Sequence, residues 1–130
     1  ILKEKRYCVE GSWGAEYPYK IISQASGNAV FLAIISRGRN PRYDINDPFT
    51  SPDNNLWNKF RESGVARIFL VGLPLETTIK EAALGFKNQN FETVILEDCI
   101  KPRNADTGKA ARQDLELAGV RFMKTSHFFD

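Results

Sequence analysis

The sequence is poor in the residues that build metal and redox sites. Histidine occurs once in 130 residues, as His127, and cysteine occurs twice, as Cys8 and Cys99. A zinc or iron site made of several histidines is therefore excluded for this chain alone. The cysteines form no CxxC pair and no metal-binding spacing. We expect both to be buried as small apolar side chains in a reducing intracellular compartment, either the cytoplasm or the mitochondrion.

Long apolar runs and a secretory signal are also lacking. No apolar run approaches the ~20 residues that a membrane-spanning helix requires, and the first residues show no signal-peptide pattern. The first residue is Ile1 rather than methionine, so we expect the sequence to be processed, trimmed or incomplete. With 42% hydrophobic and 26% charged residues, residues 1–130 can form one domain with a core of its own.

Charge of one sign is not in large excess. The net charge of +2 is too small to indicate nucleic-acid binding by itself. Two local groups of basic residues are either solvated surface or contacts with RNA or an acidic partner. They consist of Lys3, Lys5, Arg6, Arg37, Arg39 and Arg42.

Four short apolar runs predict β-strands. The runs at 29–35 and 67–73 are continuous, which is typical of strands buried on both faces of a sheet. The other two strands are predicted at 92–97 and 120–124.

Helical patterns separate these runs. One helix is predicted to start at Ser51-Pro52-Asp53 and to end at Gly64. A second begins at about Glu76, and a third runs from about 105 to 118 and is ended by Gly119. Strands that alternate with helices predict an α/β fold with a parallel sheet. Its ligand cleft is expected at the carboxyl ends of the strands, near residues 37, 74–78 and 98–103.

Several motifs occur in an order that indicates a known family. Residues 67–86, RIFLVGLPLETTIKEAALGF, combine a strand, a turn and a helix start. The stretches YCVEGSWGAE (7–16) and RGRNPRYDINDPF (37–49) precede it, and LEDC (96–99) and AGVRF…TS (118–126) follow. Over nearly the whole chain these motifs resemble the nicotinamidase-like (isochorismatase-type) cysteine hydrolases. The resemblance implies a three-layer, Rossmann-like parallel sheet of about six strands, with the first strands of the family missing from this chain.

The resemblance also implies that the catalytic positions have changed. The family's nucleophilic cysteine falls at Thr78, its lysine at Arg37 and its last metal-binding histidine at Tyr7. The aspartate base lies upstream of Ile1. A hydroxyl is far less acidic than a thiol, and an arginine does not shuttle protons near neutral pH. We therefore expect a non-catalytic member of the family, without a metal or other cofactor.

Three functions are compatible with these sequence features. The favoured hypothesis is a structural or binding subunit of an assembly. The second is an active amide hydrolase, completed by a segment not in this chain, with Thr78 or Cys99 as the nucleophile. The third is a module that binds a small ligand or RNA. The candidate binding residues are Trp13, Arg37, Thr77 and Thr78; Arg37 would hold an anion at the helix start near Glu76, whereas Trp13 lines the cleft or, as we favour, packs in the core.

Four further expectations concern geometry and partners. The family has a cis peptide before its nucleophile turn, so we predict that the Leu73–Pro74 bond is cis. A sheet without a central strand would expose unpaired backbone groups and apolar faces. We therefore expect a protein partner or an upstream segment to complete it, in an oligomer or a larger complex. We expect Phe128 and Phe129 to pack on the domain or a neighbour, and His127 to be a surface or docking residue.

Overall fold

A computed structural model describes residues 9, 11–17, 19–20 and 56–128 of the chain. The chain divides into two compact units, Ile1–Ile34 and Ile35–Asp130. Several predicted features lie outside the described residues: Tyr7, Cys8, Arg37, Phe129, the strand at 29–35 and the helix start at 51–53.

In the first unit, the described residues include a short 3₁₀ helix, η1 (Trp13–Ala15), and the helical residues Tyr19 and Lys20. Ser12 stabilises the preceding turn, because its backbone N–H and its hydroxyl both donate to the carbonyl oxygen of Val9, at 2.9 and 2.5 Å. The Trp13 side chain is 89% exposed, so the expectation that it packs in a core is wrong. A single helical turn without buried residues offers no apolar partner to an indole.

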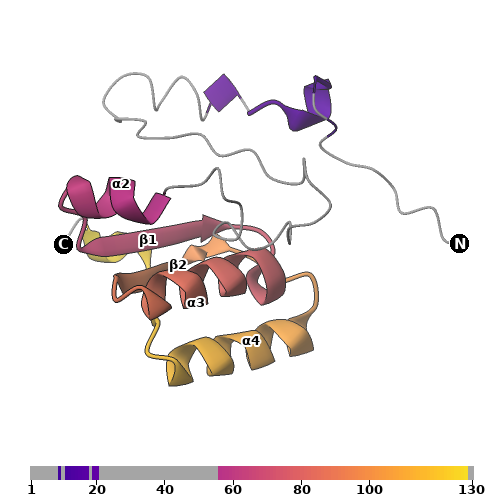
Figure 1. The fold of residues 1–130 in the computed structure, drawn as a ribbon. Coiled ribbons are helices and arrows are strands. Elements are labelled where there is room, and N and C mark those ends of the chain that lie inside the picture. The colour runs from indigo at the N-terminus through magenta and orange to yellow at the C-terminus, as the bar shows by residue number, and fades with distance from the viewer. Residues whose placement is uncertain (1–8, 10, 18, 21–55, 129–130) are drawn as a thin grey trace, which may run out of the picture. The chain divides into compact units, whose positions relative to one another are not determined.

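The described residues of the second unit form a parallel sheet of three strands in the order β1-β2-β3. The strands are β1 (Arg67–Gly72), β2 (Glu92–Ile100) and β3 (Arg121–Met123). Figure 1 shows β1 in front of β2, with the helices α3 and α4 beside the sheet. The predicted α/β fold class, the parallel sheet and the last three predicted strands are thus confirmed.

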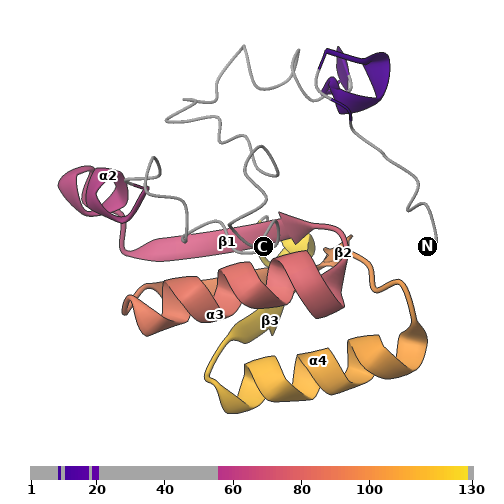
Figure 2. The same ribbon diagram turned by 45° about the vertical axis from the view of Figure 1, so that its right-hand side comes forward.

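Between residues 56 and 128, five helical segments connect and flank the strands. They are α2 (Leu56–Glu62), the single wide π-type turn η2 (Leu75–Ile79), α3 (Lys80–Asn88), α4 (Ala105–Leu117) and the 3₁₀ turn η3 (Thr125–Phe128). The two views in Figures 1 and 2 agree that α3 and α4 run side by side on one face of the sheet. The helix predicted from about Glu76 therefore begins with a π-type turn before it becomes a regular α-helix.

The main core lies between the sheet and the helices α3 and α4. Its centre is formed by Ala83, Ile95 and Leu115, each 0% exposed. Leu70 and Phe122, from the two outer strands, pack against the same cluster. Since the register pairs Leu70 with Ile95 and Ile95 with Phe122, these three side chains point to the same face.

A second, aromatic cluster attaches α2 to the rest of the unit. Phe86 from α3 lies 5.4 Å from the Trp57 ring, 5.8 Å from the Phe60 ring and 5.9 Å from the Phe91 ring. Trp57 and Phe60 are one turn apart on α2, so both rings reach the same partners. The predicted end of this helix at Gly64 is confirmed by a φ of +69°, which favours glycine.

The opposite face of the sheet carries no helix other than η3 among the described residues. Along β1 the exposed positions alternate with half-buried ones, and Phe69 and Val71 on this face are 38% and 55% exposed. The expectation that β1 is buried on both faces is therefore wrong. It holds for the central strand β2, where the successive residues Val94 and Ile95 are 1% and 0% exposed.

Helix α4 approaches the end of β2 very closely. A Cβ atom built on Gly108 would lie 2.4 Å from the Cβ of Pro102, a distance at which one of the two residues would have to move. Gly108 is one of the buried residues of α4. The absence of a side chain at position 108 therefore sets the spacing between this helix and the segment that follows β2.

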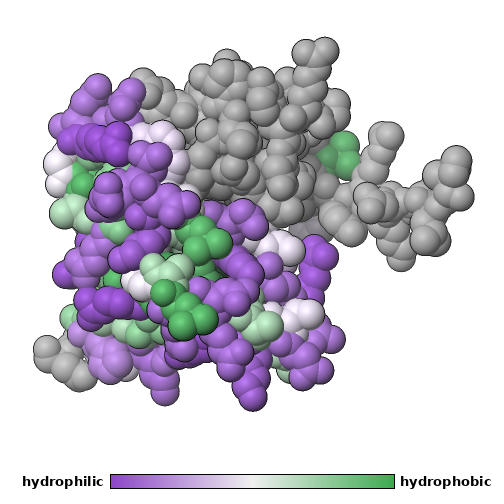
Figure 3. All heavy atoms as spheres, turned by 60° about the horizontal axis from the view of Figure 1, so that its bottom comes forward, coloured by the Kyte–Doolittle hydropathy of each residue, from purple (hydrophilic) through white to green (hydrophobic). Residues whose placement is uncertain are grey.

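The polar residues of α4 give the molecule a largely hydrophilic side. Figure 3 brings forward the side that is at the bottom of Figure 1, and there hydrophilic side chains surround small apolar patches. Leu117, at the end of α4, is 87% exposed. Within the described residues, no helix has the length and apolar character needed to cross a membrane.

Candidate functional site

The segment for which the sequence predicts a cleft begins where the chain leaves β1. Gly72 has a φ of +124°, a conformation that side-chain-bearing residues rarely adopt. The Leu73–Pro74 bond that follows is cis, as predicted. The turn η2 starts directly after it, and its closing bond runs from the N–H of Ile79 to the carbonyl oxygen of Pro74, at 3.2 Å. Turns of this π type are rare and often occur at functional sites.

The segment after β2 contacts this turn, as expected for the carboxyl ends of adjacent parallel strands. The N–H of Leu75 donates to the carbonyl oxygen of Lys101 at 3.2 Å. The Glu76 Oε1 atom accepts hydrogen bonds from the N–H groups of Arg103 and Asn104, at 2.8 and 3.2 Å. The predicted regions 74–78 and 98–103 are therefore adjacent in the structure.

The Glu76 carboxylate serves as a cap for α4. Besides the two N–H groups before the helix, its Oε1 atom also accepts from the Thr107 hydroxyl at 3.4 Å. Hydrogen bonds from its own N–H, then from the N–H groups of Arg103 and Asn104, hold the pKa of Glu76 below its ordinary value of 4.5. The other oxygen, Oε2, is shielded from solvent and has no hydrogen-bond partner among the described residues.

Asn104 completes this cap at the start of α4. Its side-chain oxygen accepts from the N–H groups of Asp106 and Thr107, at 2.8 and 3.3 Å. An asparagine at this position satisfies backbone donors that the helix itself leaves unpaired. The negatively charged end of Glu76 is thus held at the positive end of the α4 dipole, where it is stabilised.

The candidate binding residues Thr77 and Thr78 lie in η2 and are half-buried. The carbonyl oxygen of Thr77 accepts from the N–H of Lys80, which joins the turn to α3. Of the other candidates, Arg37 lies outside the described residues and Trp13 belongs to the first unit. Two of the four candidates are therefore neighbours in the turn η2.

A second connection at this edge joins β2 to η3. The carboxylate of Asp98 accepts from the N–H of Thr125 at 3.0 Å and also from the Thr125 hydroxyl. The hydroxyl bond is the main reason why the pKa of Asp98 lies below its usual range. The LEDC motif and the TS motif, which are far apart in the sequence, are thus in direct contact.

The Cys99 thiol, next to Asp98, is exposed and not buried as expected. The reason is that β2 extends to Ile100, beyond its continuous pairing with β1, which ends at Ile95. Asp98 and Cys99 are therefore exposed, whereas Ile100 at the end of the strand packs against the main core. His127 is exposed, in agreement with its predicted surface position. Phe128 packs on Phe69 with 4.9 Å between the ring centroids, which confirms its predicted packing on the domain.

Sequence reasoning did not identify Glu76 as the capping residue of α4. The Asn104 cap had a local signal, because an asparagine directly before a helical pattern is a common cap. Glu76 had none, since its partners are 27 to 31 positions further along the chain. Only the parallel arrangement of β1 and β2 brings them together.

We expect the loss of the Glu76 cap to destabilise this edge of the molecule. Glu76→Ala should lower the melting temperature, because two backbone N–H groups lose their acceptor. Glu76→Gln should lower it less, because the amide oxygen can still accept. The lowered pKa means that the charge stabilises the fold above pH 4.5 and stops doing so as pH falls through the folded-state pKa. The difference in melting temperature between the wild type and Glu76→Gln should therefore become smaller at acidic pH.

The matched control for this experiment is Glu81→Gln. Glu81 is an exposed residue on α3, so the substitution removes the same charge without touching the cap. Thermal melts followed by circular dichroism at neutral and acidic pH give the comparison. Equal melting temperatures for Glu76→Ala and Glu81→Gln would contradict the capping role.

No known family profile and no curated protein matches the sequence. Solved structures do match. A pyrazinamidase of Pyrococcus horikoshii, in complex with zinc, is 25% identical over 92% of this chain, with a TM-score of 0.74. The yeast nicotinamidase bound to nicotinaldehyde is 17% identical over 92% of the chain, with a TM-score of 0.78. The chain has the fold of these amidases. An isochorismatase-like hydrolase from Alkaliphilus metalliredigens also shares the fold, at 14% identity over 92% of the chain and a TM-score of 0.63.

The similarity covers only part of each amidase. The chain spans 62% of the length of the pyrazinamidase, 57% of the yeast nicotinamidase and 59% of the isochorismatase-like hydrolase. The isochorismatase-like fold predicted from the motifs is thus confirmed. The activity of the complete amidases does not follow for this chain from the shared fold alone.

The zinc of the pyrazinamidase raises the question of whether this chain holds a metal. In the described residues, no three histidine, cysteine, aspartate or glutamate side chains gather in positions that could bind a metal ion. The position that the resemblance assigns to a metal-binding histidine, Tyr7, lies outside them. The described residues therefore do not fit a metal site.

Proposed function

We propose that this chain is a member of the nicotinamidase-like, isochorismatase-type hydrolases that has lost catalysis and acts as a structural or binding subunit. The observation that carries the proposal is Thr78 in the turn η2. This turn follows the cis Leu73–Pro74 bond and matches the family's nucleophile segment in sequence, but it has a hydroxyl where the family has a thiol.

The carboxylate beside Thr78 in sequence is unsuited to activate it. A hydroxyl nucleophile needs an adjacent base, and a good base has a pKa near the working pH. The hydrogen bonds at the start of α4 lower the pKa of Glu76, which makes its carboxylate a weaker base. Its Oε1 atom is also occupied by Arg103, Asn104 and Thr107. Glu76 therefore stabilises the contact between η2 and the start of α4 rather than taking part in proton transfer.

An amidase assay tests the loss of catalysis. We expect the 130-residue chain to hydrolyse nicotinamide and related amides no faster than a protein-free blank. Thr78→Ala and the matched control Thr77→Ala should behave like the unchanged chain, since both threonines are half-buried residues of the same turn. Turnover that is abolished by Thr78→Ala and retained by Thr77→Ala would overturn the proposal in favour of an active hydrolase.

The binding role rests on the exposed sheet. Among the described strands, β1 pairs only with β2, and Val71 and Leu73 at its end are 55% and 67% exposed. An open strand edge with apolar side chains favours association with a further strand or a protein surface. We therefore propose that a protein partner, or a segment outside this sequence, completes the sheet in an oligomer or larger complex.

The solution state of the isolated chain tests this second part. We expect light scattering after gel filtration to show that the isolated chain self-associates. A monomer with a sharp, reversible melt would count against a required partner. This outcome is independent of the amidase assay, so the two parts of the proposal can fail separately.

A further inference from the structure

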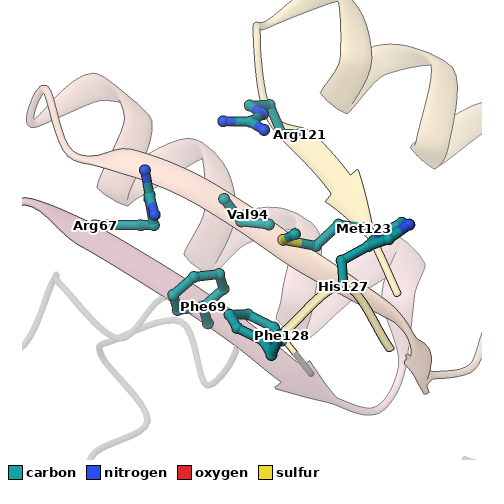
Figure 4. A pocket seen from close by; sticks show the side chains of 7 residues that line it. All are labelled: Arg67, Phe69, Val94, Arg121, Met123, His127 and Phe128. Atoms are coloured by element: carbon teal, nitrogen blue, oxygen red, sulfur yellow. The ribbon is translucent and has the colours of Figure 1, made fainter. Parts of the chain in front are cut away.

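A hollow of about 180 Å³ lies on the sheet face that faces away from α3 and α4. It is lined by Arg67, Phe69, Val94, Arg121, Met123, His127 and Phe128 (Figure 4). The register pairs Phe69 with Val94 and Val94 with Arg121, so the residues from all three strands point to the same side of the sheet. This site is separate from the turn η2, which follows the carboxyl end of β1.

The floor and one wall of the hollow are apolar. Val94 at the floor is 1% exposed, and the rings of Phe69 and Phe128 meet edge to face, with 72° between their planes. Figure 4 shows these two rings side by side on one side of the hollow, with Met123 and His127 on another. Such a surface offers an aromatic ring both apolar contact and favourable ring–ring geometry.

The first residues of two strands add positive charge to the rim of the hollow. Arg67 and Arg121 are the first residues of β1 and β3, and both bind the carboxylate of Glu92, the first residue of β2. The ion pairs are 2.7 Å long from Arg67 Nε and 2.8 Å long from Arg121 Nη1. Since one carboxylate is shared between two guanidiniums, the three side chains together keep a net positive charge. Beyond these bonds, each guanidinium has further N–H groups to donate.

We propose that this hollow binds a small aromatic carboxylate, with its ring against Phe69 and Phe128 and its carboxylate at the two arginines. The accessible lining of the hollow is more polar than apolar, and its converging polar groups can orient an anionic ligand over the apolar floor. Guanidinium groups match the planar geometry of a carboxylate. The volume is below the roughly 300 Å³ at which sites for drug-sized molecules begin, so it suits a ligand with one ring. The proposal does not depend on the scaffold role of the chain.

Benzoate and its neutral analogue benzamide are the probes. We expect titration of the ¹⁵N-labelled chain with benzoate to shift the amide resonances of Val94 and His127, with a Kd on the order of 1 mM because the ligand is small. Benzamide should bind about tenfold more weakly, because it lacks the charge that the arginines recognise. Added salt should weaken benzoate binding but not benzamide binding.

Substitutions test whether benzoate binds in the hollow. Arg121→Gln and Arg67→Gln should each weaken benzoate binding about tenfold by removing a charge-assisted hydrogen bond. In either variant Glu92 keeps its other arginine. The matched control is Arg61→Gln, since Arg61 lies on α2 and donates to Gln89 at 2.8 Å. Phe128→Ala should also weaken benzoate binding, which gives a second test if an arginine variant lowers the melting temperature.

Three results would overturn the proposal. One is the absence of saturable benzoate shifts at Val94 and His127 in the unchanged chain. Another is equal binding of benzoate and benzamide, which would make the hollow an apolar surface without anion recognition. The last is an equal loss of affinity in Arg61→Gln and Arg121→Gln, which would place the effect in the overall charge rather than in the site.

Discussion

Leu115→Ala should lower the free energy of unfolding by about 2–5 kcal/mol. Leu115 is 0% exposed in the middle of the main core, where α4 meets α3 and the sheet. Its removal leaves a cavity between close-packed neighbours such as Ala83 and Ile95, which cannot move far enough to fill it. Urea unfolding followed by circular dichroism measures the loss.

The matched control is Leu117→Ala in the same helix. Leu117 is 87% exposed, so its side chain gains little from folding, and the free energy of unfolding should change by less than about 0.5 kcal/mol. Similar losses for the two variants would mean that α4 does not bury the face that carries Ala111 and Leu115.

Phe86→Ala should have a comparable or larger effect, a loss of about 3–5 kcal/mol in the free energy of unfolding. The Phe86 ring is 5% exposed and, among the described residues, contacts the rings of Trp57, Phe60 and Phe91. Because Trp57 and Phe60 belong to α2, we expect this variant to loosen α2 as well. Hydrogen exchange of the α2 amides would then rise more than that of α4.

Phe128→Ala provides the comparison for Phe86. The same atoms are removed, but Phe128 is 47% exposed and its one described ring contact is with Phe69. The loss of stability should therefore be clearly smaller. If Phe128→Ala cost as much as Phe86→Ala, the aromatic cluster around α2 would not be a principal source of stability.

Local patterns in the sequence were sufficient to predict most elements of the second unit. The apolar runs gave β1, β2 and β3 to within a few residues, and the helical spacing gave α4 with its end at Gly119, where φ is +82°. These features depend on residues that are close in sequence. The cis bond at Leu73–Pro74 and the hydrolase fold came from the resemblance of motifs.

The errors concern burial, which depends on distant parts of the chain. The sequence of β1 is as apolar as that of a strand covered on both sides, yet Phe69 and Val71 are exposed because α3 and α4 lie on the other face. Cys99 was expected in the core, although β2 continues past the end of its regular pairing. Neither the side on which a helix packs nor the length of a paired strand is encoded in a short run of residues.

The candidate site was predicted only in part. Its location at the carboxyl ends of β1 and β2 and the place of Thr78 followed from the motifs. The partners of Glu76 and Asp98 did not, because each bond joins segments more than 25 residues apart. The hollow beside Arg67 and Arg121 had no sequence signal, since it depends on the register of three strands.

The close approach of Gly108 to Pro102 has a consequence for related sequences. Alanine at a helical position normally favours the helix over glycine, but here its methyl group would overlap the proline ring. A relative with a larger residue at 108 must either have a smaller one at 102 or shift its helix outward. Such a shift would also move Asn104 away from the Glu76 carboxylate, so these four positions should vary together during evolution rather than one at a time.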